Sequence, residues 1–178
     1  MVRQLCLLLL SSVLMPLTLA GPTSVFVPNW FFLENRLYQE PMVVLDELEN
    51  TDISSWSDKQ KVHYFDLLAG AYLVLSDYEL AEETLNQGLA LKESAEPYIL
   101  VNMITLNGYF KELSGEMEAA ESEYHTALRL AEQSGSYDAM LVALNALISF
   151  YSFTEEQYEV ALTYVEQGSD IAKYADRE

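Results

Sequence analysis

From Trp30 onward, apolar residues recur at helical spacing along most of the chain. This spacing places them on one face of a helix, whereas strict alternation would indicate a strand. Clusters of Ser, Gly and Pro interrupt the pattern at intervals of about one helix and a turn. The pattern therefore predicts no paired strand, and it predicts helices near residues 29–39, 41–50, 58–75, 77–93, 97–113, 116–133, 137–153 and 155–175.

Particular residues mark where these helices begin and end. The segments 76–79 and 154–157 fit the capping box, in which a hydroxyl and a carboxylate or amide satisfy free backbone amides. Proline suits a first helical position because it has no amide hydrogen to lose there, and glycine suits a left-handed residue that ends a helix. These preferences predict helix starts at Pro41 and Pro97, and helix ends at Gly115 and Gly135.

Small residues recur with a fixed period in the second half of the chain. Ala81, Ala120 and Ala161 are spaced 39 and 41 residues apart. A larger residue follows each by four positions and a small one by seven: Leu85, Tyr124 and Val165, then Gly88, Ala127 and Gly168. A fixed period indicates supersecondary units stacked on their neighbours, and small residues suit places where helices touch.

This pattern resembles the tetratricopeptide repeat (TPR). The best copy consists of Leu68-Ala69, Tyr72, Ala81, Leu85 and Gly88, and the next of Gly108, Gly115, Ala120, Tyr124 and Ala127-Leu128. The period exceeds the usual 34 residues, as in repeats of bacterial signalling and regulatory proteins. The resemblance implies an all-α, right-handed solenoid of three or four stacked antiparallel helix pairs. Its repeats would span about 58–94, 97–135 and 137–175, after a helical cap or degenerate hairpin at 21–57.

Residues 1–20 differ from the rest of the chain. Arg3 precedes an apolar run that is broken by Pro16 and followed by small residues up to Ala20. This arrangement is typical of a secretory signal peptide, and the run is shorter than the roughly 20 apolar residues of a membrane helix. We therefore expect a periplasmic or secreted protein, with an uncleaved anchor as the alternative.

The net charge argues against several kinds of partner. Loss of Arg3 with the leader takes the formal charge from −19 to −20. Nucleic acids and anionic membranes need clustered Lys and Arg, which here are scattered one at a time, so we expect neither as a partner. Cys6, the one cysteine, also lies in the leader, so the mature chain must be held by its core without disulfides.

Motifs for catalysis or cofactor binding are missing from the sequence. It contains no Gly-x-Ser-x-Gly, Gly-x-Gly-x-x-Gly, Gly-Lys-Ser or His-Glu-x-x-His. Glu121 and His125 stand one helical turn apart but lack a third metal ligand. Paired acids, among them Glu82 with Glu83 and Glu121 with Glu123, are interpreted as solvated helix faces. We therefore expect no enzyme, no cofactor and no metal site.

The TPR resemblance places a binding surface on the concave face, which the first helix of each pair lines. The positions carried over are His63, Asp66, Asn102, Thr105, Tyr109, Glu112 and Asn145, with Gly70, Ser149 and Ser152 beside them. Such an acidic, aromatic groove suits a basic or apolar segment, with Tyr109 as an anchor and Asp66 and Glu112 as charge partners. Tyr109 could equally pack against the next repeat. An amide such as that of Asn102 can hold a peptide backbone by donating and accepting together.

Two functions remain open at this point. The first is an exported scaffold that binds a peptide or protein partner on its concave face. The alternative is the periplasmic input segment of a larger membrane-bound signalling protein, of the GGDEF diguanylate cyclase or histidine kinase type. The sequence also leaves open whether the chain forms a homodimer.

Overall fold

The computed structural model describes residues 29–152 and 157–175, and every regular element in this part is helical. The prediction of an all-α protein is therefore confirmed for the described residues. The α-helices are α1 (Trp30–Leu37), α2 (Pro41–Glu49), α3 (Asp58–Val74), α4 (Tyr78–Leu89), α5 (Pro97–Leu113), α6 (Met117–Ser134), α7 (Tyr137–Ser152) and α8 (Tyr158–Ala175). The helix predicted at 77–93 is shorter than expected, because α4 ends at Leu89 and a 3-10 turn, η1 (Lys92–Ser94), follows it.

Most predicted helix boundaries are confirmed, and one is wrong. Pro41 and Pro97 begin α2 and α5, and Gly115 and Gly135 have φ angles of 80° and 70°. Ser76 does not cap α4: it is itself left-handed, with φ 63°, in the turn that ends α3. The N-cap is Asp77, one residue later, whose side chain accepts the amide of Leu80.

A capping box that the sequence analysis did not single out begins α3. The side chain of Ser57 accepts the amide of Gln60, and the side chain of Gln60 accepts the amide of Ser57. The second predicted capping box, at 154–157, and the predicted signal peptide, at 1–20, fall on residues outside the described ranges.

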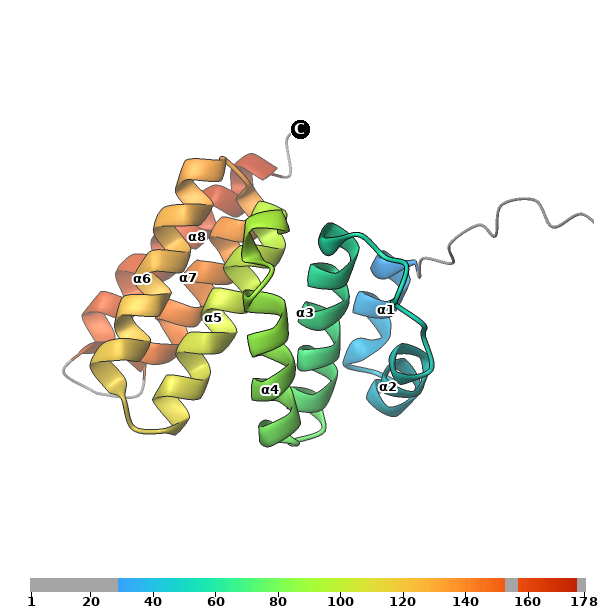
Figure 1. Cartoon of the computed structure of the whole chain (residues 1–178). Coiled ribbons are helices and arrows are strands. Elements are labelled where there is room, and N and C mark those ends of the chain that lie inside the picture. The colour runs from blue at the N-terminus through green and yellow to red at the C-terminus, as the bar shows by residue number, and fades with distance from the viewer. Residues whose placement is uncertain (1–28, 153–156, 176–178) are drawn as a thin grey trace, which may run out of the picture.

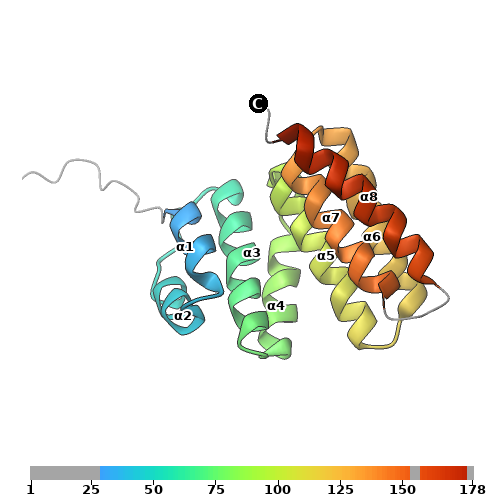
Figure 2. The same ribbon diagram turned by 180° about the vertical axis from the view of Figure 1, so that it is seen from behind.

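Three antiparallel hairpins make up most of the described molecule (Figure 1). They pair α3 with α4, α5 with α6 and α7 with α8, and α5 also packs against α7 and α3. The short helices α1 and α2 pack on α3 at one end, and α8 lies at the other end (Figure 2). Helices distant in the chain, α1, α3, α5 and α7, are thereby brought around one shared space.

The small residues noticed in the sequence lie where helices meet. Ala81, Ala120 and Ala127 are fully buried. A Cβ at Gly88 would stand 3.1 Å from Cβ of Phe65 and 2.7 Å from the flexible end of Met103, so α3 and α5 pack tightly against this small residue. Gly168, at the equivalent place in the last hairpin, is less tightly enclosed, because its nearest neighbour would be a Leu144 methyl 3.8 Å away.

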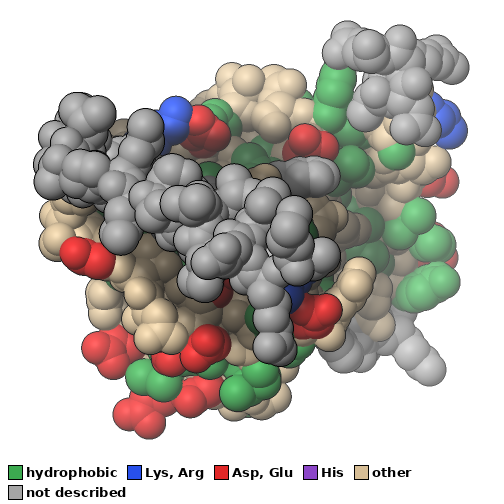
Figure 3. All heavy atoms as spheres, turned by 90° about the vertical axis from the view of Figure 1, so that its right-hand side faces the viewer, with side chains coloured by type: hydrophobic (Ala, Val, Ile, Leu, Met, Phe, Trp, Pro, Cys, Tyr) green, Lys and Arg blue, Asp and Glu red, His purple; other side chains and the backbone are tan. Residues whose placement is uncertain are grey.

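Acidic side chains are spread over the face seen in Figure 3, and basic ones appear there at separate places. This distribution agrees with the strongly negative formal charge of the sequence. Among the helices of the described ranges, none is both long enough and apolar enough to cross a membrane.

Candidate functional site

A groove with a volume of about 460 Å³ lies among α1, α3, α5, α6 and α7. Among the described residues that line it, the charged ones are the carboxylates Glu34, Asp66 and Glu112, and none is Lys or Arg. Apolar side chains complete much of the wall, including Leu37, Leu67, Leu73, Val74 and Leu106. The groove therefore combines an apolar surface with negative charge.

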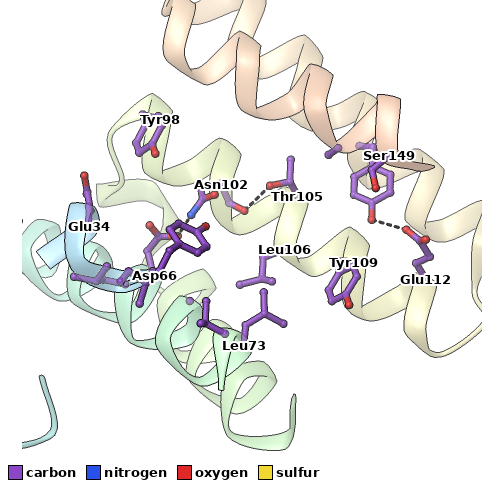
Figure 4. A pocket seen from close by; sticks show the side chains of 17 residues that line it. Glu34, Asp66, Leu73, Tyr98, Asn102, Thr105, Leu106, Tyr109, Glu112 and Ser149 are labelled. Atoms are coloured by element: carbon purple, nitrogen blue, oxygen red, sulfur yellow. Dashed lines mark hydrogen bonds between the residues drawn. The ribbon is translucent and has the colours of Figure 1, made fainter. Parts of the chain in front are cut away.

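The polar groups are separated along the groove (Figure 4). Glu34, Asp66, Tyr98 and Asn102 lie at one end, which we call the Asp66 end. Tyr109, Glu112 and Ser149 lie at the other, the Glu112 end. Leu73 and Leu106 lie between them, so an occupant that spans the groove meets polar, apolar and again polar surface.

Asp66 is the most deeply buried charged residue of the groove. Its side chain leaves the middle of α3 and is 6% exposed. The amide nitrogen Nδ2 of Asn102, on α5, donates to its Oδ1 atom at 2.7 Å. Burial raises the pKa of Asp66 to about 7; the Asn102 hydrogen bond and His63 act against this rise, and the negative charge of Glu34 adds to it.

His63 lies beside the groove and not in its lining. Its Nε2 atom is 2.7 Å from Oε1 of Glu34, and its ring stacks on Trp30 with 4.6 Å between the ring centres. His63 lines an adjoining cavity that shares Glu34 and Tyr98 with the groove. The contact between His63 and Glu34 thus joins α3 to α1 next to the Asp66 end of the groove.

The Glu112 end is organised by a hydrogen bond between α5 and α6. The hydroxyl of Tyr124 donates to Oε2 of Glu112 at 2.9 Å. Burial and this hydrogen bond raise the pKa of Tyr124 well above its usual range, so the phenol keeps its proton and stays a donor. Tyr109 is partly buried beside Phe110 and also lines the groove, so it both packs and presents a surface.

The structure brings most of the predicted site residues together. Asp66, Asn102, Thr105, Tyr109 and Glu112 all line the groove, as do Gly70 and Ser149. The hydroxyl of Thr105 donates to the backbone oxygen of Asn102 within α5, so its hydrogen is already engaged. Asn145 is exposed, and neither it nor Ser152 is among the residues that line the groove.

Four polar or aromatic lining residues escaped the sequence analysis: Glu34, Tyr38, Tyr98 and Tyr124. Glu34 and Tyr38 belong to the segment interpreted as a cap, which carries no repeat signature. Tyr124 was assigned to the scaffold because it occupies the bulky position of the repeat. Of these four, only Tyr98 could have been selected from the sequence, because it directly follows Pro97, at which the first helix of a repeat was predicted to begin.

The acidic pairs outside the groove have different surroundings. Glu82 and Glu83 are exposed, as predicted. Glu121 and Glu123 are partly exposed, and they also make contacts that the interpretation did not foresee. Glu123 accepts hydrogen bonds from Asn107 and Lys111, and Glu121 accepts the hydroxyl of Tyr151. The same hydroxyl lies 3.1 Å from Nε2 of His125, so Glu121 and His125 share a tyrosine. Within the described ranges, no three His, Cys, Asp or Glu side chains are placed to hold a metal ion.

Comparison of the chain with protein-family models, with curated proteins and with solved structures found no match. The functional argument therefore rests on the groove itself.

Proposed function

We propose that this chain is an exported helical scaffold that binds an extended segment of a protein partner in the groove and catalyses no reaction. The observation that carries the proposal is the groove itself, which lies among five helices and includes five of the seven residues selected from the sequence as a binding face. In this proposal the three hairpins are TPR-like units of a solenoid, and the groove is its concave face. The periodic small residues and the order of the hairpins support that part.

The chemistry of the groove favours a polypeptide segment as its occupant. Apolar side chains of the segment would contact Leu73 and Leu106, while backbone groups would meet Ser149 and the free oxygen of the Asn102 amide. The Asn102 nitrogen already donates to Asp66, so the amide is oriented before a partner arrives.

A tryptophan at the rim tests whether the groove is where binding occurs. Ser149 is exposed on α7 and lines the groove, so Ser149→Trp should fill it while leaving the core intact. The matched control is Ser122→Trp, at an exposed position of α6 outside the lining. Both variants of the full chain are compared with the unmodified chain for capture of phage that display random dodecapeptides, and thermal melts check that all three fold.

We expect the unmodified chain to enrich a set of related peptides. Ser122→Trp should retain them, and Ser149→Trp should reduce their capture at least about tenfold, because an indole at the rim excludes the segment. Absence of any enrichment would contradict the proposal. Equal capture by both tryptophan variants would place the binding surface outside the groove.

A further inference from the structure

Asp66 is a buried carboxyl without an oppositely charged hydrogen-bond partner. Among the described residues, the hydrogen bond to its Oδ1 comes from a neutral amide, that of Asn102, and no Lys or Arg side chain forms an ion pair with it. Burial of an ionised carboxylate is unfavourable unless a cation or several donors compensate it. Among the described residues, Asp66 therefore has a neutral donor but no cation to balance its charge.

The residues around Asp66 do not supply a cation for its carboxylate. Glu34 adds a second negative charge at the same end of the groove. His63 also acts on Asp66, but its Nε2 atom is directed to Glu34 at 2.7 Å. An incoming cation at this end would meet Asp66, Glu34 and the ring of Tyr98, and none of the described residues that line the groove is a competing Lys or Arg.

We propose that the Asp66 end recognises a lysine or arginine side chain of the bound segment. The cation lies against the Asp66 carboxylate beside Glu34 and Tyr98, and the apolar middle of the groove holds the residues next to it. This inference rests on the proposed function and adds to it the chemical class of the bound residue. The net charge of the chain favours the same partner, because a basic segment is drawn toward an acidic protein.

Three features of this end fit a cationic side chain. The carboxylate supplies a charge-assisted acceptor, which is stronger than a neutral one. The aromatic ring of Tyr98 supplies a face on which a guanidinium or ammonium group can lie. Asn102 fixes the carboxylate through Oδ1 and so leaves the second oxygen for the incoming donor.

The Glu112 end is not equivalent. Its carboxylate already accepts the hydroxyl of Tyr124 and lies beyond the apolar middle of the groove. Glu112 nevertheless lines the groove, so the matched control is Glu82, an exposed carboxylate of α4 outside the groove lining.

Because a cation binds the ionised form of Asp66, its affinity should depend on pH. Burial raises the pKa of Asp66 to about 7, and a bound cation favours its ionised form. The titratable groups that face this end or line the adjoining cavity are Glu34 and Tyr38 from the α1 side, His63 from α3, Glu96 and Tyr98 at the start of α5 and Asp138 from α7. Lys59 lies next to them in an ion pair with Glu96. Binding of a cationic residue should therefore strengthen as pH rises through about 7.

The test uses pools of random nonapeptides that differ only at the fixed central position. This position carries arginine, lysine or citrulline, which has the shape of arginine without its charge. Binding of each labelled pool to the full chain is measured by fluorescence anisotropy at about pH 6 and about pH 8, on either side of the Asp66 pKa. The proteins are the unmodified chain, Asp66→Asn and Glu82→Gln.

We expect the unmodified chain to prefer the arginine and lysine pools to the citrulline pool about tenfold at the higher pH, and less at the lower pH. Asp66→Asn should abolish the preference while it still binds the citrulline pool, and Glu82→Gln should retain it. Because the pH dependence is measured on the unmodified chain, this part of the test does not depend on the folding of Asp66→Asn.

Two results would overturn this inference while leaving the proposed function intact. One is binding that Ser149→Trp abolishes but that shows no preference for a cation. The other is a preference that persists in Asp66→Asn or disappears in Glu82→Gln. If no pool binds and random dodecapeptides are not enriched either, the proposed function fails as well.

Discussion

The surroundings of Asp66 make its ionisation unfavourable for folding but leave its carboxylate available for binding. In the free protein the carboxyl is buried and has one neutral hydrogen-bond donor, so ionisation of Asp66 destabilises the fold. Because no cation pairs with Asp66, its carboxylate remains available as an acceptor for a ligand. Residues that bind ligands commonly reduce stability in this way, and their replacement by a neutral residue of the same shape stabilises the fold.

This argument predicts how stability changes with pH at the level of one residue. Burial raises the Asp66 pKa from 3.8 to about 7 in the folded chain. Between these two values the folded state holds a proton that the unfolded state has released, so the Asp66 contribution to stability falls as pH rises and is lost above about 7. Asp66→Asn cannot ionise and should escape this loss.

Urea unfolding of both proteins at about pH 5 and about pH 8 provides the measurement. The free energy of unfolding of Asp66→Asn, relative to the unmodified chain, should increase by roughly 1–3 kcal/mol between the two pH values. An unchanged difference between Asp66→Asn and the unmodified chain would mean that Asp66 ionises freely.

At the scale of the helices, the sequence predicted the elements well and their ends less well. The apolar period depends on many residues together, so an error at one position does not move a helix. A cap depends on one or two residues, and the backbone at Ser76 shows the difference: its serine-to-glutamate spacing fits a capping box, yet the turn after α3 places this residue in the left-handed region. The actual cap, Asp77, is the next residue.

The approach of α6 to α5 supplies a prediction at this scale. A Cβ at Gly108 would stand 2.7 Å from Cε1 of Tyr124, a buried ring whose hydroxyl is bonded to Glu112. Gly108→Ala should therefore destabilise the chain by about 1–3 kcal/mol, because the ring cannot move aside without loss of that hydrogen bond.

Gly168→Ala is the matched control for this substitution. It also lies inside a helix, but the nearest atom to its Cβ would be 3.8 Å away, in ordinary contact. Alanine has the higher helix propensity, so this variant should gain up to about 1 kcal/mol. Thermal melts of both variants measure the two effects, and a similar loss in both would show that neither depends on the ring of Tyr124.

At the scale of the whole molecule, the composition of the groove shows why the sequence revealed only part of it. Asp66, Asn102 and Tyr109 occupy first helices of repeats, so the periodic pattern aligned them. Glu34 comes from α1, which lies outside the repeats and reaches the groove only because α1 packs against α3. Such a contribution depends on how one end of the chain folds back on the rest, and a local pattern carries no information about that.

The last prediction separates binding in the groove from non-specific attraction of basic peptides to the negatively charged surface. An acidic chain attracts any basic peptide over its exposed surface, and salt screens that attraction strongly. Asp66 is buried, so its contact with a cation should be screened much less.

With the arginine pool, an increase of NaCl from about 0.05 M to about 0.5 M should weaken binding to Asp66→Asn several-fold. The affinity difference between the unmodified chain and this variant should change less than about twofold. A difference that vanishes with salt would attribute the preference to the surface as a whole and not to the buried carboxylate.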